Sequence, residues 1–456
     1  MKRFKKALFI FHRDLRLEDN RGLNEALSTS QEALPVFIFD DVQVGEKNQY
    51  RSIPAIQFMI ESLEDLSAAL EKRNGKLFCF SGLTQEIVKK LIKQENIDAV
   101  FSNRDYTPFA QKRDAMLAHD AAQLGVHYQL VDDALLCNPD TILTGKGTPY
   151  TIYTAFFKRA VQEKFTEPQK EARGLFVNDQ IKGSVTLTAC KKQLGLKEQS
   201  LLQKGGAQEA HKILKHLGDF KTYTQFRDYP ERSTTHLSAH LKFGTISPRQ
   251  VYAAIQDHKA DPTLIKQLYW RDFFTYLAYH WPHVFGKPFH KKYEHLAWEK
   301  NDDWFKRWCE GTTGFPLVDA GMRELNTTGY MHNRVRMVVA SFLTKDMHID
   351  WRRGERYFAQ HLIDYDPCVN NGNWQWAAST GADAQPYFRI FNPWLQQKKF
   401  DPECSYIKKW IPELKTLSAR EIHGWYKVQA SKNGYPVPLL DHAVESKKAK
   451  KLFLAV

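Results

Sequence analysis

The chain has 456 residues, of which 43% are hydrophobic and 13% aromatic, and its formal net charge is +13. Two domains are expected at this length, and the hydrophobic fraction is typical of a globular protein with a packed core. The basic excess favours a polyanionic partner, because phosphate contacts supply most of the non-specific affinity of proteins for DNA.

No stretch approaches the ~20 apolar residues of a membrane helix, so we expect no membrane partner. The apolar run 7–11 is too short for a secretion signal, and charged residues end it. The six cysteines form no CxxC pair, which argues against a zinc knuckle or a redox motif. Scattered single cysteines are typical of a reducing compartment, so we expect a cytoplasmic protein without a metal site.

Short apolar runs alternate with amphipathic segments over the first 131 residues. Continuous apolar strands separated by helices predict a doubly wound parallel sheet, so we assign residues 1–131 to a Rossmann-like α/β domain. No GxGxxG motif follows the first strand, and the sheet therefore lacks the usual dinucleotide fingerprint. The predicted strands are 7–11, 35–40, 76–80, 98–102 and 127–131, with helices over 55–71, 85–95 and 109–124.

Residues 132–205 lack clean periodicity and contain several Pro and Gly, which predicts an interdomain linker with some helix near 153–163. A faint P-loop at 145–148 fails, because Asp140 stands where the first Gly belongs and Gly147 where the Ser/Thr belongs. Residues 206–456 are predicted to form an all-α domain with a short Lys-rich tail. Its predicted helices are 207–217, 248–256, 263–279, 303–310, 316–328, 333–345 and 353–362.

All 11 Trp lie in the predicted helical domain. Core packing explains most Trp in proteins, but it does not favour one half of a chain, whereas a cofactor with aromatic redox partners or a base-stacking surface would. Polar and aromatic residues also share helix faces at i, i+3 and i+4 spacing, as do Gln267, Trp270 and Arg271, and likewise Asn333, Arg336 and Met337. A helix with a satisfied polar face is the competing interpretation for each set.

Two carboxylates stand close together at Asp364 and Asp366. They could pair with the Arg336 guanidinium or bind a polar cofactor together with it, and a general acid/base dyad is the competing interpretation. The sequence contains no Ser-His-Asp order, HExxH or GxSxG motif that would support a hydrolase.

Several long motifs resemble the photolyase/cryptochrome family, in the family's order and over nearly the whole chain. Within the family the sequence is most similar to the class I bacterial photolyases that act on cyclobutane pyrimidine dimers (CPD). The motifs are HRDLRLEDN at 12–20, LSAHLKFGTISP at 237–248, WRDF at 270–273, MHNRVRM at 331–337, DWR at 350–352, NNGNWQWA at 370–377 and YFRIFNP at 387–393.

The resemblance implies a non-covalent FAD in the helical domain, which agrees with the missing GxGxxG. His236 replaces the family's more usual Arg, which weakens one expected phosphate contact. The FAD-binding residues that the resemblance implies are Tyr223, Thr234, Thr235, His236, Leu237, Ser238, Gln267, Arg271, Asn333, Arg336, Asp364, Tyr365, Asp366 and Asn370.

The implied catalytic residues are the electron-transfer triad Trp298, Trp351 and Trp374, together with Asn370 and Gln267. Asn370 would face the flavin N5, where a neutral amide can hydrogen-bond a reduced flavin without giving up a proton irreversibly. Photolyases resemble one another in this Asn, whereas plant cryptochromes carry Asp and animal ones often Cys, so Asn370 favours repair.

The implied activity is light-driven repair by a monomer whose partner is UV-damaged DNA. Blue-light-excited reduced FAD would donate an electron to a flipped-out dimer and split it to monomers, and Trp270 and Trp376 would flank that dimer. The implied DNA-binding residues are Arg227, Gln267, Trp270, Asn333, Arg334, Met337, Trp376, Arg389 and Gln396.

Three alternatives and one cofactor stay open, and the third alternative is a light-independent DNA-binding flavoprotein, which the Trp triad disfavours. Photolyases specific for (6-4) photoproducts carry His where this chain has Asn333 and Met337, yet Gln267 is their choice, since most bacterial dimer enzymes place Glu there. A blue-light-sensing cryptochrome would differ at Asn370 and usually carry a long tail. The family's folate-binding features are missing at 106–108 and 283–286, so a second, antenna chromophore would be methenyltetrahydrofolate, a deazaflavin or a flavin.

Overall fold

The computed structural model describes residues 2–456 and divides into two compact units. Unit 1 contains the N-terminal part of the chain up to Gln199, together with Gln203–Lys221 and Thr235–His280. Unit 2 contains Ser200–Leu202, Thr222–Thr234 and Trp281–Val456. Within residues 2–456, none of the helices combines the length and the apolar character that crossing a bilayer requires.

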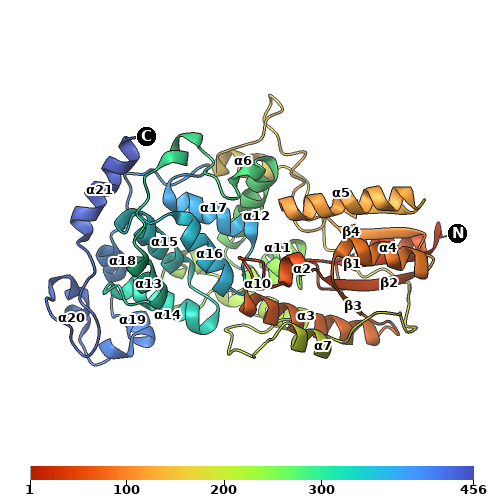
Figure 1. The fold of residues 1–456 in the computed structure, drawn as a ribbon, viewed down its shortest axis with the longest axis horizontal. Helices are drawn as coiled ribbons and strands as arrows, with labels where there is room; N and C mark the ends of the chain where they lie inside the picture. Colours follow the sequence, from red (N-terminus) through yellow and green to blue (C-terminus); the bar gives the residue numbers. More distant parts are fainter. Residues whose placement is uncertain (1) are drawn as a thin grey trace. The chain divides into compact units, whose positions relative to one another are not determined.

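Unit 1 is built on a parallel sheet of strand order β3-β2-β1-β4-β5, with β6 paired to β2. The sequence prediction of a doubly wound parallel sheet is therefore confirmed, with all five predicted strands in place (Figure 1). The strands are β1 (Phe4–Phe11), β2 (Ser30–Phe39), β3 (Phe78–Ser81), β4 (Ala99–Asn103), β5 (His127–Val131) and β6 (Leu175–Phe176).

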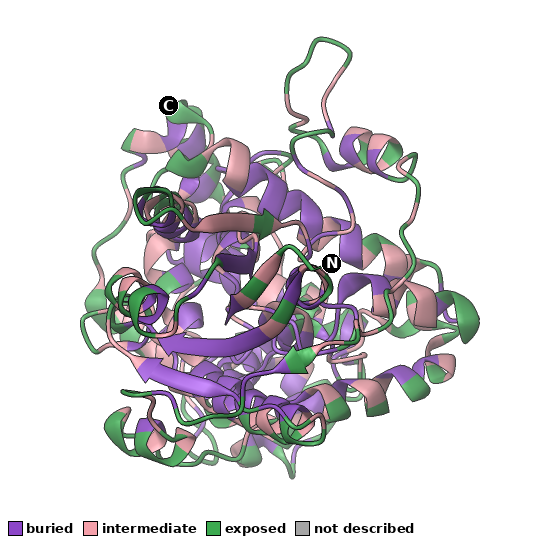
Figure 2. Ribbon diagram, turned by 90° about the vertical axis from the view of Figure 1, so that its right-hand side faces the viewer, coloured by how far each residue is buried: buried purple, intermediate pink, exposed green. Residues whose placement is uncertain are grey.

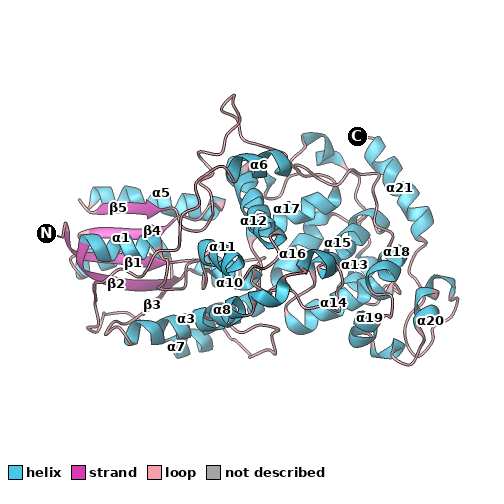
Figure 3. Cartoon of the chain, turned by 180° about the vertical axis from the view of Figure 1, so that it is seen from behind, coloured by secondary structure: helices cyan, strands magenta, loops and turns pink. Residues whose placement is uncertain are grey.

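Both faces of the sheet are covered by helices, which is why the central strands contain continuous apolar runs, such as Ala7–Phe11 in β1 and Ala33–Phe39 in β2. On one face Leu8 and Ile10 pack with Val88 of α4 and Leu117 of α5, whereas Figures 1 and 3 show α3 on the opposite side. Figure 2 shows strands coloured as buried along most of their length, whereas the edge strand β5 is intermediate or exposed throughout. The covering helices are α1 (Arg21–Thr29), α3 (Ile53–Glu71), α4 (Thr84–Gln94) and α5 (Pro108–Gln123), and the short α2 (Asp41–Val44) follows β2.

The division by contacts does not coincide with the predicted boundary at residue 206. Residues 132–205, predicted as a linker, contribute β6 to the sheet and α6, which packs on α12. Helices from the predicted all-α domain also belong to unit 1, because they carry side chains that are buried against its sheet loops. These further helices of unit 1 are α6 (Tyr153–Ala160), α7 (Leu187–Gln193), α8 (Ala207–Lys215), α10 (Ser238–Phe243), α11 (Pro248–Asp257) and α12 (Thr263–His280).

Unit 2 is helical, and Figure 3 shows only helices and loops in its described part. Its core contains buried aromatic and aliphatic side chains, among them Trp308, Phe315 and Trp374. The predicted helix 333–345 ends as an α-helix at Ser341 and continues as a π-helical turn over Phe342–Asp346. The α-helices are α9 (Tyr223–Phe226), α13 (Asp302–Glu310), α14 (Pro316–Thr328), α15 (Asn333–Ser341), α16 (Trp351–His361), α17 (Pro367–Ala378), α18 (Pro393–Phe400), α19 (Ser405–Trp410), α20 (Ala419–His423) and α21 (His442–Leu454).

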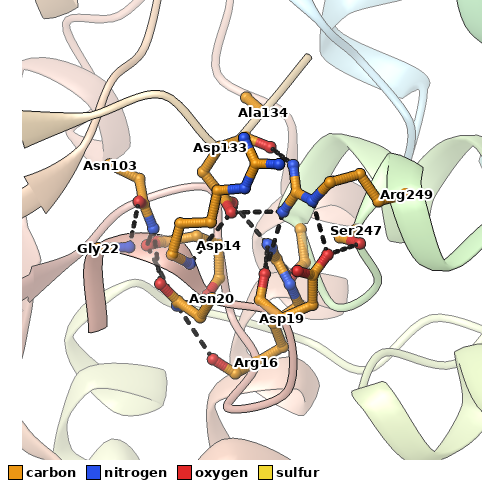
Figure 4. Close-up of polar contacts among 12 residues, drawn as sticks. Asp14, Arg16, Asp19, Asn20, Gly22, Asn103, Asp133, Ala134, Ser247 and Arg249 are labelled. Carbon is orange, nitrogen blue, oxygen red and sulfur yellow. Dashed lines mark hydrogen bonds and ion pairs between the residues drawn. The ribbon is translucent and has the colours of Figure 1, made fainter. Parts of the chain in front are cut away.

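A buried polar network in unit 1 joins the loop after β1 to the loop after β5 and to α11 (Figure 4). Arg249 is only 2% exposed. Its Nε lies 2.8 Å from Asp19 Oδ2, and its Nη2 lies 2.7 Å from Asp133 Oδ1. Arg16 reaches the other oxygen of Asp133 at 2.5 Å. Two guanidiniums and two carboxylates thus satisfy one another away from water, as buried charges must.

The charges of this network set the ionisation of Asp133. Burial alone would raise the pKa of Asp133, but the adjacent guanidiniums of Arg16 and Arg249 outweigh it and hold that pKa below its ordinary value. Asp133 therefore stays ionised in the folded protein, and each cation of the network has a fixed counter-charge.

Replacing Arg249 with Met should strongly destabilise unit 1, because it leaves Asp19 and Asp133 buried with less compensation. We expect the free energy of unfolding to fall by about 3–5 kcal/mol. Arg159→Met is the matched control, since Arg159 forms a more exposed pair with Glu163 at 2.7 Å, and its loss should cost less than about 1 kcal/mol. Urea unfolding measures both, and equal losses would contradict the importance of this network.

Candidate functional site

Helix α17 places Asn370 and Trp374 on one face. Asp366 begins the helix, because its Oδ1 accepts a hydrogen bond from Val369 N at 3.1 Å, and Pro367 follows at the first helical position. Asn370 is 9% exposed, and its Nδ2 donates to the backbone oxygen of Glu355 on α16 at 3.1 Å. Its amide oxygen accepts no hydrogen bond from residues 2–456, so it is oriented and available to a donor on a bound group.

A second polar layer lies behind Asn370. Asn371 Nδ2 donates to Glu355 Oε1 at 2.9 Å and to Val284 O at 3.0 Å. Burial raises the pKa of Glu355 to about 7, although the hydrogen bond from Asn371 opposes this shift. Glu355 therefore changes ionisation close to neutral pH, directly behind the amide that its own backbone holds.

Two indoles of the predicted relay are buried in unit 2. Trp374 is 2% exposed and Trp351 1% exposed. The Trp374 ring packs edge-on against Phe358 at 4.9 Å between centroids, and it lies against Gly354, where a Cβ atom would stand 2.2 Å from Trp374 Cη2. Gly354 therefore allows α16 and α17 to approach closely enough for these side chains to meet.

Trp298 differs from the other two indoles because it is only partly buried. Its ring lies 6.2 Å from that of Phe453 on α21. Glu299 N donates to His348 O at 2.7 Å, and Glu299 bridges Ile349, so the segment after Trp298 runs beside the one that enters α16 at Trp351. Two of the three indoles are therefore buried, and the third has more access to solvent.

Arg336 and Asp364 form a two-pronged ion pair. Arg336 Nη1 lies 3.2 Å from Asp364 Oδ1 and Nη2 lies 2.9 Å from Oδ2, while Nε donates to Met331 O at 2.7 Å. Burial lowers the pKa of Arg336, but Asp364, together with Tyr330 and Glu324, outweighs burial, and the net shift of the pKa is upward. Since Asp366 caps α17, the structure favours the pairing over the acid/base dyad.

Unit 1 carries six of the implied FAD residues, which are Thr235, His236, Leu237, Ser238, Gln267 and Arg271, and two of the DNA residues, Gln267 and Trp270. Arg271 Nη1 donates to Ala134 O at 2.8 Å and to Asp272 Oδ1 at 3.0 Å. Trp270 stacks on Tyr153, and Gln267 Nε2 donates at 3.4 Å to Thr263 O on its own helix. Thr235, His236, Leu237 and Ser238 lie at the entry to α10, where His236 has a left-handed backbone with φ of 52°.

The implied DNA-binding residues of unit 2 differ in their solvent exposure and in their ion-pair partners. Arg334 pairs with Asp228 at 2.8 Å and lies over the Phe400 ring at 4.5 Å, so its side chain is only 14% exposed. Arg389 is exposed and Arg227 half-buried. Half-buried positions are also occupied by Met337, Trp376 and Gln396, and by the implied FAD residues Tyr223, Thr234 and Tyr365, whereas Asn333 is exposed.

Sequence reasoning missed Glu355, Asn371 and Gly354. A Gly inside a predicted helix signals a close approach of another group, so Gly354 could have been found. Glu355 carries no comparable signal, because a carboxylate in a charged helical segment usually faces solvent.

The residues of unit 2 fit a flavin. The Asn370 amide oxygen is a neutral acceptor for a ring N–H, and the Arg336–Asp364 pair offers fixed charges to a polar group. Buried Trp374 lies one helical turn after Asn370 on α17, so the predicted electron donor shares a helix face with this amide.

Comparison with known proteins agrees with this geometry. Residues 7–173 match the family model for DNA photolyase, and residues 264–455 match the model for the FAD binding domain of DNA photolyase. The deoxyribodipyrimidine photo-lyase of Halobacterium salinarum is 36% identical over 478 residues, covering 98% of each chain.

Two solved structures are also similar. The archaeal photolyase from Sulfolobus tokodaii, with two FAD molecules, matches with a TM-score of 0.90 at 42% identity, over 99% of this chain and 100% of that one. The cryptochrome of Synechocystis sp. PCC6803 matches with a TM-score of 0.91 at 28% identity, over the same shares. The chain therefore belongs to the photolyase/cryptochrome family and contains its FAD-binding domain.

Proposed function

We propose that the chain is a light-driven DNA-repair enzyme that splits cyclobutane pyrimidine dimers. Curated relatives named deoxyribodipyrimidine photo-lyase match it over nearly its whole length at about 34–36% identity. The observation that carries the proposal is Asn370, whose neutral amide is held by Glu355 with its oxygen turned to no partner within residues 2–456.

Bound FAD supplies the absorption of blue light and the electron that splits the dimer. Asn370 contributes a hydrogen bond and no acidic proton, because an amide does not ionise at neutral pH. The buried indoles of Trp374 and Trp351 would return an electron to the flavin, and Trp298 would form the more exposed end of that route. Arg336 and Asp364 would hold polar groups of the cofactor in place.

The DNA side of the proposal needs the dimer to leave the duplex, which costs a few kcal/mol. Stacking on Trp270 and Trp376 would recover ~1–3 kcal/mol per base. Arg389 is exposed and would contact a phosphate directly, whereas Arg334 would first exchange its partner Asp228, which also lies 3.9 Å from Arg227. The net charge of +13 supports such a partner.

Two specific observations favour other members of the family. Gln267 favours a (6-4) photolyase, and the Synechocystis match favours a cryptochrome. Asn370 argues against a cryptochrome, and Asn333 and Met337 replace the His pair of (6-4) enzymes. The two FAD molecules of the Sulfolobus protein favour a second flavin among the three candidate antenna chromophores.

Six free cysteines support a cytoplasmic location, and we expect a monomer.

Blue light should restore thymines from a duplex with one cyclobutane dimer, and darkness should not. The purified protein is illuminated in parallel with a duplex that carries one (6-4) photoproduct, and restored bases are quantified by chromatography. Bases restored from the (6-4) duplex alone would overturn the proposed substrate.

Gln267→Glu should raise the yield of dimer repair per absorbed photon. Gln267 can hydrogen-bond a thymine carbonyl but cannot protonate it, whereas a protonated Glu carboxyl can do both. Gln256→Glu on α11 is the control, because it makes the same substitution at an exposed position of unit 1. An unchanged yield in Gln267→Glu would count against a substrate role for residue 267.

Trp374→Phe should slow the light-driven reduction of the bound flavin to a small fraction of the wild-type rate. Repair by chemically reduced protein should persist, because that reaction needs no replenishing electron. Trp308→Phe is the matched control, since Trp308 is equally buried and its ring lies 6.2 Å from that of Trp374. Transient absorption under blue light measures the rates, and equal rates in both variants would contradict the relay.

A further inference from the structure

Helix α6 is fastened to α12 by polar contacts at its start. Tyr150 N donates to Tyr276 Oη at 2.8 Å, and Tyr153 Oη donates to Lys266 O at 2.9 Å. The Phe156 ring then packs on the Phe273 ring at 5.2 Å between centroids. The segment around α6, which the sequence predicted to be part of a linker, therefore packs firmly on α12.

The ring of Tyr153 covers one face of the Trp270 indole. Their centroids are 3.6 Å apart and their planes differ by 8°, which is fuller overlap than the offset pairs usual in proteins. Tyr153 is 8% exposed, whereas Trp270 stays partly exposed. A base that stacks on Trp270 must therefore use the face opposite Tyr153, and the Phe274 ring lies tilted by 31° at 5.6 Å from the same indole.

The tyrosine hydroxyl holds this stack in register with α12. Its acceptor, Lys266 O, lies one helical turn before Trp270 on α12. The same helix therefore positions both the tyrosine ring and the indole. An indole held in this way keeps its orientation before DNA arrives, and little rotamer freedom is left to lose on binding.

We propose that Tyr153 is a positioning residue for the lesion, which fixes the plane of Trp270 so that the face opposite Tyr153 stacks on an extruded pyrimidine. This inference rests on the proposed function, because it assigns Tyr153 to the same stacking site. A role in packing alone would instead change stability, with no selective effect on damaged DNA.

The test compares full-length variants for binding of two duplexes, one with a single thymine cyclobutane dimer and one undamaged. Tyr153→Leu removes the flat ring, Tyr153→Met keeps most of the apolar volume, and Tyr153→Phe keeps the ring without the hydroxyl. Phe165→Leu is the control, since it removes another stacked pair of unit 1, with Tyr252 at 4.2 Å. Trp270→Ala reports the full contribution of the indole.

Tyr153→Leu and Tyr153→Met should each weaken binding of the dimer duplex roughly tenfold, with binding of undamaged duplex and light-driven flavin reduction unchanged. Tyr153→Phe should lose less, and Phe165→Leu should match the wild type. Should Tyr153→Leu fold poorly, as thermal unfolding would reveal, Tyr153→Met decides.

Two outcomes would overturn the inference, and they are distinguishable. If Trp270→Ala loses dimer binding but Tyr153→Met does not, the positioning role fails and the proposed function stands. If Trp270→Ala itself binds the dimer duplex as the wild type does, the stacking site fails, and the inference fails with it.

Discussion

The close approach of α16 and α17 at Gly354 is the constraint on which the helical unit depends. A Cβ atom at residue 354 would collide with the Trp374 ring, so only Gly allows the two helices to meet at this distance. The same approach brings the backbone of Glu355 within hydrogen-bond distance of the Asn370 amide. Helix α16 also begins at Trp351. One packing contact thereby positions the Asn370 amide and the two buried indoles of Trp351 and Trp374.

In unit 1, buried polar groups hydrogen-bond one another at the carboxyl ends of the strands. Its strand order reverses between β1 and β4, and open α/β sheets usually bind a ligand at the carboxyl ends of the strands beside such a reversal. Here Asn103, at the end of β4, donates to Asp14 after β1 at 2.5 Å and to Asn20 at 2.7 Å. These groups satisfy one another, in agreement with a loop after β1 that lacks the dinucleotide fingerprint.

Strong local patterns made much of the fold predictable from the sequence. The five strands follow from short apolar runs, and the implied FAD-binding residues follow from the long family motifs. Helix α17 was harder to predict, because it is buried on several sides and its apolar residues show no single stripe, although Asp366-Pro367 signals its start. Long-range contacts were out of reach: neither the pairing of Arg334 with Asp228 nor the stacking of Tyr153 on Trp270 leaves a local trace.

The absorbance spectrum of the purified protein, recorded before and after denaturation, tests the central claim most directly. If α16 and α17 build a flavin site, the protein is coloured, and denaturation releases a flavin that mass spectrometry identifies as FAD. A colourless protein that releases no flavin, purified from cells that supply it, would contradict the account.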